Sequence, residues 1–373
     1  MASFYETADE VQTERAILVG VKLPGAIDYE FDESLKELRL LSTSAGARVL
    51  DIITQERKKI DPAYFIGKGK VSEIREKVEG EGANIVVFDE ELAPAQIRNL
   101  ENGLGVKVID RTTLILDIFV KRAKTNEAKV QVELAQLNHL LPRLTRQWTH
   151  LSKQYGGIGT KGPGETQLET DRRLINNKIK ILKKKLKKID NERITQRKNR
   201  LDLYRVCLVG YTNAGKSTLF NCLTKSGVTT ENRLFSTLDS TTRKLSDSNG
   251  HKILMTDTVG FINKLPHQLV ASFKSTLDEV RLANLLIHVV DFSHPHYLKR
   301  IANVSEVLAE IGADKIPIIM AFNKIDKSPE PYAEFGHYFT PDLRNFFISS
   351  IKKQGIEHLI KRITFLADDN NSA

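Results

Sequence analysis

One eight-residue segment constrains the fold of this 373-residue chain more than any other. The segment Gly210-Tyr-Thr-Asn-Ala-Gly215-Lys216-Ser217 matches the pattern GxxxxGK[ST], and it lies between the apolar run YRVCLVG and the helical run STLFNCLT. Backbone N–H groups of such a loop, together with the N-terminus of the following helix, face an anion. The segment therefore predicts a phosphate-binding loop between a buried strand and a helix, and with it an α/β domain.

The chain after residue 203 repeats this alternation, and two further signatures follow strands in it. Strands are expected at 204–210, 251–257, 285–291, 317–323 and 345–350. DTVG (257–260) ends the second strand, and NKID (323–326) follows the fourth. The Asp326 carboxylate can accept hydrogen bonds from the two N–H donors of guanine, which adenine lacks. The three signatures in this order therefore predict that the bound nucleotide is GTP.

The residue types in these motifs suit a phosphate chain with its metal ion. Lys216 can neutralise the β- and γ-phosphates, and the Ser217 hydroxyl can bind Mg²⁺. Asp257, at the end of its strand, can hold the same Mg²⁺ through water, and the Gly260 N–H can reach the γ-phosphate. We therefore expect Mg²⁺ as the cofactor.

The N-terminal part of the chain predicts a second, smaller α/β unit. Short apolar strands are expected at 16–23, 48–54, 84–90 and 106–110, and helices between them at 31–44, 69–80 and 94–102. Buried strands that alternate with helical crossovers form parallel sheets. The tetrapeptide Gly67-Lys68-Gly69-Lys70 raises a second nucleotide site as an alternative, but it matches a phosphate loop poorly, and a tight turn is the favoured interpretation.

Residues 126–202 predict an antiparallel helical hairpin. Two segments each contain apolar residues at successive intervals of 4, 3, 4 and 3 residues, which is a heptad-like seam. Pro142 is expected to perturb or end the first helix. The seams consist of Val130, Leu134, Leu137, Leu141 and Leu144, and of Ile175, Ile179, Leu182, Leu186 and Ile189. The predicted division is therefore an N-terminal α/β domain at 1–125, the hairpin at 126–202 and a Ras-like P-loop GTPase domain at 203–373.

The charge of the chain is concentrated in the second helix of this hairpin. Residues 172–200 hold 13 Lys and Arg against only Asp190 and Glu192, so this segment accounts for the net charge of +9. Five glycines within residues 156–164 form the connection at the hairpin tip. These features favour contact with nucleic-acid phosphates, and the alternatives are a solvated helix face and a flexible connector.

Composition excludes several classes of protein. No apolar stretch approaches the roughly 20 residues that span a bilayer, and the acidic start MASFYETADE is typical of neither a secretory signal nor a transit peptide. The two cysteines, Cys207 and Cys222, fit no disulfide scaffold or metal motif. We expect a cytoplasmic protein, and since each seam is satisfied within the hairpin, we expect a monomer.

Several longer segments closely resemble the HflX family, within the Obg and HflX superfamily of translation-factor-class GTPases. They are YFIGKGKVSEI, VVFDEELAPAQIRNLE, AKVQVELAQLNHLLPRL, GGIGTKGPGETQLETDRR and DTVGFINKLPHQLVASFKSTLDEV, and the segment from Phe235 to Arg243 resembles the family's switch I region. The resemblance covers about residues 15–350. It implies that Thr237 completes the coordination of Mg²⁺ with Ser217 and Asp257, and that Lys216, Thr237 and Gly260 serve catalysis.

The motifs and the resemblance together predict two sets of site residues. The GTP-binding set is Gly210, Tyr211, Thr212, Asn213, Ala214, Gly215, Lys216, Ser217, Phe235, Ser236, Thr237, Leu238, Asp239, Asp257, Thr258, Val259, Gly260, Asn323, Lys324, Ile325, Asp326, Ser349, Ser350 and Ile351. The ribosome-binding set is Gly156, Gly157, Gly159, Lys161, Gly162, Gly164, Glu165, Arg172, Arg173, Lys183, Lys184 and Lys185.

The sequence departs from the family pattern in two places. Many HflX proteins carry a further small C-terminal domain, whereas this chain stops soon after residue 351. Ser349-Ser350-Ile351 also replaces the Ser-Ala-Lys that usually lies beside the guanine base.

Phe261 follows Gly260, at the position where Ras-like enzymes place a water-orienting glutamine. Either Phe261 impairs hydrolysis or it is a packing residue. Both interpretations predict slow intrinsic GTP hydrolysis that a partner can accelerate.

The resemblance implies binding to the large ribosomal subunit and its rRNA, with dissociation or rescue of stalled ribosomes under stress. Two alternatives stay open. The chain could be a GTP-gated protein that binds free RNA, or a regulator of a membrane protease that associates with a membrane surface without spanning it.

Overall fold

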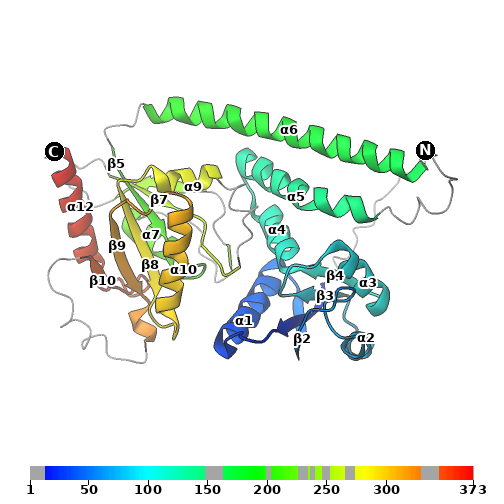
Figure 1. Cartoon of the computed structure of the whole chain (residues 1–373). Helices are drawn as coiled ribbons and strands as arrows, with labels where there is room; N and C mark the ends of the chain where they lie inside the picture. Colours follow the sequence, from blue (N-terminus) through cyan, green and yellow to red (C-terminus); the bar gives the residue numbers. More distant parts are fainter. Residues whose placement is uncertain are drawn as a thin grey trace, which may run out of the picture. The chain divides into compact units, whose positions relative to one another are not determined.

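The computed structural model describes residues 13–147, 163–198, 203–225, 234–235, 240–245, 253–264, 274–328 and 344–372 (Figure 1). The chain forms two compact units. Unit 1 contains Met1–Ile118 and Pro142–Leu168, and unit 2 contains Phe119–Leu141 and Glu169–Ala373.

Unit 1 contains the predicted parallel sheet. Its strands β1 (Arg15–Lys22), β2 (Arg48–Glu56), β3 (Ile85–Phe88) and β4 (Lys107–Asp110) lie in the order β2-β1-β3-β4, and every pair is parallel. The crossover helices are α1 (Asp28–Ala45), α2 (Lys68–Glu81) and α3 (Pro94–Leu104). Gly67 to Lys70 therefore lie at the start of α2.

The two faces of this sheet are covered by different helices. Ile17 and Val19 of β1 belong to the same apolar cluster as Ile74 of α2 and Leu100 of α3. The opposite face lies under α1, where a Cβ added at Gly20 would come within 2.6 Å of a Leu35 methyl group. Strands buried on both faces explain why their sequences are apolar throughout rather than alternating.

A helix that the sequence analysis did not predict follows β4. Helix α4 (Arg111–Arg122) begins where the Asp110 carboxylate accepts hydrogen bonds from the Thr113 N–H at 2.9 Å and from its hydroxyl at 2.6 Å. This side-chain cap satisfies an N–H group that the first helical turn leaves without a backbone partner. Burial of Leu114, Ile115 and Ile118 then outweighs the low helix propensity of the β-branched residues.

Unit 1 also buries ionic groups at the carboxyl ends of β3 and β4. Arg111 is 2% exposed and pairs with Glu37 and with Asp89, whose Oδ1 lies 2.6 Å from the guanidinium. Asp110 is fully buried and pairs with Arg143 at 2.6 Å. Burial alone would raise the pKa of Asp110, but the Arg143 charge and the hydrogen bonds from Thr113 and Arg143 together hold that pKa below its usual value.

The helical hairpin is formed by α5 (Asn126–Gln147) and α6 (Pro163–Lys198). Eight of the ten predicted seam residues pack in one apolar cluster, where Val130, Leu134, Ile179 and Leu182 are buried and Leu137, Leu141, Ile175 and Leu186 are partly buried. An ion pair of 2.6 Å joins Lys178 to Glu133. Helices that share such a seam pack side by side, as Figure 1 shows.

Of the two expected effects of Pro142, perturbing or ending the first helix, the second is wrong. Helix α5 continues through Pro142 to Gln147. A proline removes one backbone hydrogen bond and crowds the preceding turn, which costs about 3 kcal/mol. One residue further on, Arg143 pairs with the buried Asp110 at 2.6 Å, so this part of the helix is bonded to the end of β4.

Unit 2 contains a six-stranded sheet in the order β10-β9-β8-β5-β7-β6. Five strands match expected ones: β5 (Tyr204–Val209), β7 (Ile253–Asp257), β8 (Leu285–Asp291), β9 (Ile318–Asn323) and β10 (Asn345–Phe347). The sixth, β6 (Thr241–Lys244), was not predicted because its polar sequence TTRK lacks an apolar face. It lies antiparallel to β7 at the sheet edge, where polar residues are tolerated.

Helices cover both faces of this sheet. Val206 and Leu208 of β5 cluster with residues of α7 (Lys216–Thr224) and α12 (Ile356–Ser372). Cys207 and Val209 point to the other face, with residues of α9 (Lys274–Arg281) and α10 (Tyr297–Glu310). The chain therefore leaves β5 toward α7 on one face of the sheet and leaves β7 toward α9 on the other face. Open α/β sheets bind ligands where such connections diverge, which here is the carboxyl end of β5.

Within the described part of the chain, we find no helix both long enough and apolar enough to cross a bilayer.

The buried pair of Asp110 and Arg143 yields a stability prediction. Asp110→Asn leaves the Arg143 charge without its counter-ion, so we expect the free energy of unfolding at pH 7 to fall by about 3–5 kcal/mol. Because the folded-state pKa of Asp110 is lowered, its contribution is present above the unfolded pKa of about 4 and is lost as pH falls through the folded value. Urea unfolding of both proteins between pH 7 and pH 3 measures the difference.

The matched control is Glu91→Gln, since Glu91 lies 3.9 Å from the same guanidinium but its side chain is 62% exposed. It should change stability by less than about 1 kcal/mol. A difference between Asp110→Asn and the parent chain that stays constant down to pH 3 would contradict the ionic explanation.

Candidate functional site

The phosphate loop leaves β5 at Gly210 and enters α7 at Lys216. A side chain at Gly210 would place its Cβ 2.3 Å from the Val289 carbonyl oxygen of the neighbouring strand, and Gly210 has φ 143°. At Gly215, φ is 95° and a Cβ would lie 2.3 Å from Nδ2 of Asn323. Both positions need glycine, because the loop passes in contact with its neighbours in conformations that other residues avoid.

Lys216 lies buried beneath this loop. Its ammonium donates hydrogen bonds to the carbonyl oxygens of Gly210 at 3.1 Å and Tyr211 at 2.8 Å, and the residue is 6% exposed. Burial lowers the pKa of Lys216 to about 8, against the opposing effect of the Asp257 charge. Because burial disfavours the charged form of this lysine, an anionic ligand such as a phosphate chain would stabilise that form.

Two oxygen ligands suited to Mg²⁺ lie together beside Lys216. The Ser217 hydroxyl, at the start of α7, donates to Oδ2 of Asp257 at 2.6 Å, and Asp257, at the end of β7, is fully buried. A hydroxyl and a carboxylate are the hard donors that Mg²⁺ takes, with phosphate oxygens and water completing its shell. The donor set present here fits the ion.

The DTVG segment lies directly against the phosphate loop. The Thr258 hydroxyl donates to the Leu208 carbonyl oxygen at 2.6 Å, which anchors the segment to β5. A Cβ at Gly260 would lie 2.7 Å from the Lys216 ammonium and 2.8 Å from the Thr212 Cα. Gly260 is therefore required by close approach, since a larger residue would separate the two loops.

Phe261 is a packing residue in this structure. It is 5% exposed and belongs to an apolar cluster with Tyr211, Val280 and Leu308. Its backbone also pairs with the phosphate loop, because the Thr212 N–H donates to the Phe261 carbonyl oxygen at 2.7 Å. Its hydrocarbon ring offers no hydrogen bond to water.

The NKID segment follows β9 and is joined to the phosphate loop. Nδ2 of Asn323 donates to the Ala214 carbonyl oxygen at 2.9 Å. The Lys324 ammonium donates to the Asn213 carbonyl oxygen at 2.8 Å and to Asp291 at 2.7 Å. These bonds fix the distance between the phosphate end and the base end of the site.

The serines after β10 complete the base end. The Ser349 hydroxyl donates to Oδ1 of Asp326 at 2.6 Å, and this bond lowers the pKa of the Asp326 carboxyl. The Ser350 N–H and hydroxyl both donate to Oδ1 of Asn323, at 3.0 and 2.9 Å. Ile351 is 68% exposed beside them. The altered triplet thus still supplies the backbone and hydroxyl groups that hold Asn323 and Asp326.

Some residues around the site were not predicted. Asp291, the ion-pair partner of Lys324, ends β8 just as Asp257 ends β7, so its place at a strand end was a usable signal. His288 is 3% exposed, and burial followed by the charge of Lys216 lowers its pKa to about 4. Arg300 of α10 lies 4.5 Å from the centre of the Tyr211 ring. Nothing in the sequence pattern indicated His288 or Arg300.

Several predicted site residues lie outside the described residues: Ser236, Thr237, Leu238, Asp239, Gly156, Gly157, Gly159, Lys161 and Gly162. Gly164 and Glu165 lie in the first turn of α6. Phe235 is described, and its ring packs edge-on against Phe119, with 4.7 Å between ring centroids. The side chain of Phe235 therefore contacts an apolar neighbour.

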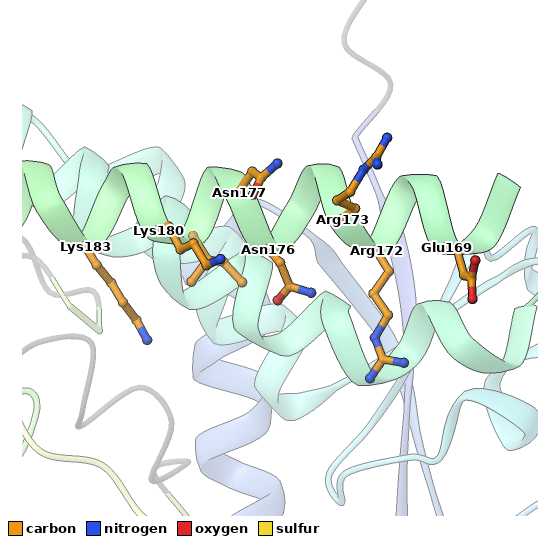
Figure 2. A pocket seen from close by; sticks show the side chains of 8 residues that line it. Glu169, Arg172, Arg173, Asn176, Asn177, Lys180 and Lys183 are labelled. Carbon is orange, nitrogen blue, oxygen red and sulfur yellow. The ribbon is translucent and has the colours of Figure 1, made fainter. Parts of the chain in front are cut away.

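The basic face of α6 forms a candidate nucleic-acid interface. Arg172, Arg173 and Lys183 line one pocket together with Glu169, Asn176, Asn177, Ile179 and Lys180. Figure 2 shows Arg172 and Lys183 extending to one side of the helix and Arg173 to the other. Lys183, Lys184 and Lys185 are all exposed. The predicted cations are thus available on more than one face of the helix.

Models of known families match three successive parts of the chain. The model described as "GTP-binding GTPase N-terminal" matches residues 32–120, and "GTP-binding GTPase Middle Region" matches residues 122–200. The model described as "50S ribosome-binding GTPase" matches residues 205–324. The last match contains the phosphate loop and the DTVG and NKID segments.

Curated relatives match most of the chain. The chain is 47% identical to "GTPase HflX" of Caldanaerobacter subterraneus subsp. tengcongensis, over 94% of this chain and 80% of the relative. It is 50% identical to "GTPase HflX" of Escherichia coli, over 84% of this chain and 73% of the relative.

Solved structures agree in architecture. A GTP-binding protein from the archaeon Sulfolobus solfataricus in complex with GDP matches with a TM-score of 0.50 and 26% identity, over 96% of this chain and 99% of that one. A structure titled "crystal structure of SsGBP and GDP complex" matches with a TM-score of 0.53 and 27% identity over the same shares. With the three GTPase motifs assembled at the carboxyl ends of the parallel strands of one sheet, the chain belongs to the HflX family and is a GTPase that hydrolyses GTP.

Proposed function

We propose that GTP hydrolysis by this chain serves binding to the large ribosomal subunit and the dissociation or rescue of stalled ribosomes under stress. The exposed cations of α6 carry this proposal, because a helix of single-signed charge over several turns suits rRNA phosphates. The match of residues 205–324 to a family described as ribosome-binding supports it. The family boundaries near residues 121 and 200 likewise support the proposed division at 125 and 202.

In the proposed site, each motif acts on one part of GTP. Lys216 neutralises the β- and γ-phosphates, the Gly260 N–H donates to the γ-phosphate, and Asp326 accepts from the guanine N–H groups. Ser217, Asp257 through water, and Thr237 would hold Mg²⁺, which supplies positive charge to the β- and γ-phosphate oxygens when bound. Lys216, Thr237 and Gly260 are the proposed catalytic residues.

Intrinsic hydrolysis is proposed to be slow. Phosphoryl transfer depends on positioning water, and Phe261, which is buried against Tyr211, cannot do so. A ribosomal contact that rearranges the segment around Gly260 would raise the rate, which makes GTP a timer for binding.

The same cations would also suit free RNA, which makes a GTP-gated protein acting on free RNA the second candidate function. The two candidates differ in whether hydrolysis responds to purified large subunits or to RNA alone.

The first prediction concerns ribosomal stimulation. GTP turnover of the parent chain should rise when purified large subunits are added, whereas Lys216→Ala should show almost no turnover in either condition, because the main charge on the phosphates is lost. Steady-state phosphate release measures both. Turnover indifferent to subunits but raised by protein-free RNA would favour the free-RNA function instead.

The second prediction concerns the base. Asp326→Ala should reduce the preference for GTP over ATP on the order of 100-fold or more, because the variant cannot pair the guanine donors. Competition binding with a fluorescent nucleotide measures the preference. Asp314→Ala, at an exposed position in the same domain, is the control and should keep the preference of the parent chain.

The third prediction concerns the basic helix. Reversing Lys183, Lys184 and Lys185 to Glu should weaken binding to large subunits and make the affinity less dependent on salt, because fewer counter-ions are released. Sedimentation at several salt concentrations measures both effects. The control reverses Lys36, Lys58 and Lys59, which are equally exposed and change the net charge by the same amount. Equal effects of the two triple variants would mean that only overall charge matters.

A further inference from the structure

One side chain of the phosphate loop has a polar atom that the loop itself does not use. Thr212 is 4% exposed, and among the described residues its hydroxyl has no hydrogen-bond partner. Its backbone N–H, by contrast, donates to the Phe261 carbonyl oxygen at 2.7 Å. The hydroxyl, and not the backbone, is therefore the group that needs an explanation.

A buried hydroxyl without a partner is unfavourable to folding. Burial removes its hydrogen bonds to water, and valine would fill almost the same space without that loss. The Thr258 hydroxyl, close by in the same domain, shows the usual arrangement, because it is buried and donates to the Leu208 carbonyl oxygen. Unpartnered polar groups of this kind are found where a site keeps them for a ligand.

The neighbours of Thr212 point to the γ-phosphate of GTP as the ligand of its hydroxyl. A Cβ at Gly260 would lie 2.8 Å from both Cα and Cγ2 of Thr212, and 2.7 Å from the Lys216 ammonium. Thr212, Lys216 and Gly260 are therefore close neighbours. Lys216 and Gly260 are the residues proposed above to contact the γ-phosphate. The Thr212 side chain belongs to the γ-phosphate end of the site.

Among the described residues, the position directly after Gly260 holds no side chain that can orient water. Phe261 occupies the position after Gly260, is 5% exposed and packs with Val280 and Leu308. A threonine hydroxyl can donate one hydrogen bond and accept others, so it can contact a phosphate oxygen and a water molecule together.

We propose that the Thr212 hydroxyl is a catalytic hydrogen-bonding group in GTP hydrolysis, donating to a γ-phosphate oxygen and accepting from the attacking water. In this step the water oxygen forms a bond to the γ-phosphorus while the bond to the β–γ bridging oxygen breaks, and that electron pair stays on GDP. The proton from water passes to a phosphate oxygen, and Thr212 keeps its own proton. The inference rests on GTP hydrolysis by this chain and not on the ribosomal role.

The present structure shows what must move for this contact to form. The Thr212 N–H donates to the Phe261 carbonyl oxygen, and the Phe261 N–H donates to the Gly210 carbonyl oxygen at 3.1 Å. These two bonds close the DTVG segment over Thr212. Under this proposal, we expect a γ-phosphate beside Lys216 to displace the DTVG segment and to contact the Thr212 hydroxyl.

The test compares Thr212→Val, which keeps the shape but removes the hydroxyl, with Thr212→Ser, which keeps the hydroxyl. Single-turnover hydrolysis is measured in the full chain at saturating GTP without ribosomes, together with GDP affinity and the melting temperature of the nucleotide-free protein. Thr212→Val should hydrolyse GTP at least about 10-fold more slowly with GDP affinity within about 3-fold of the parent chain, and should melt at the same or a higher temperature. Thr212→Ser should stay within about 3-fold of the parent rate.

The matched control is Thr224→Val, whose hydroxyl donates to the Phe220 carbonyl oxygen within α7 and which should keep the parent rate. Parent-like hydrolysis by Thr212→Val would overturn the proposal. Equal slowing of Thr212→Val and Thr212→Ser would also overturn the proposal, because the shape of the side chain and not its hydroxyl would then matter. A loss of GDP affinity large enough to account for the slower rate would overturn it as well. Ribosomal stimulation of the parent chain is a separate readout, so the proposed function can fail without this inference failing.

Discussion

Close approach of three loops at the carboxyl edge of one sheet is the constraint on which the site depends. Gly210 passes against the backbone of β8, and Gly260 lies against Lys216 and Thr212. Asn323 and Lys324 then bond the carbonyl oxygens of Ala214 and Asn213. Each loop is held by backbone groups of another, so the residues proposed to bind phosphate, Mg²⁺ and base are fixed relative to one another without a ligand.

This arrangement leaves polar groups that folding alone does not explain. Burial lowers the pKa of Lys216 to about 8, and the hydroxyl of Thr212 has no hydrogen-bond partner among the described residues. A Cβ added at Gly260 would lie 2.7 Å from the Lys216 ammonium and 2.8 Å from Cγ2 of Thr212, so both side chains lie close to Gly260. Burial of these two groups is unfavourable to folding, and a charged ligand with many acceptor oxygens would remove that cost by pairing with them. Binding sites commonly keep such locally unfavourable groups for their ligands.

Unit 1 uses buried charge differently. Arg111 pairs with Glu37 and Asp89, and Asp110 pairs with Arg143. These pairs join α1, the start of α4 and the end of α5 to the carboxyl ends of β3 and β4. Buried ion pairs of this kind cost much to break, although they add little compared with well-packed apolar residues.

The sequence by itself determined the elements whose causes are local: the strand, glycine loop and helix around Lys216, the strand end at Asp257, the NKID segment after β9, and the two heptad seams. Their patterns repeat at the period of the element that they form, so spacing alone reveals them. Tertiary structure decided the rest. Helix α4 begins where Asp110 caps it and its apolar residues are buried, and α5 continues past Pro142 to a turn in which Arg143 pairs with Asp110. The packing of Phe261 against Val280 and Leu308 and the burial of Thr212 against Gly260 depend on residues distant in sequence, and no local pattern specifies a contact that only folding creates.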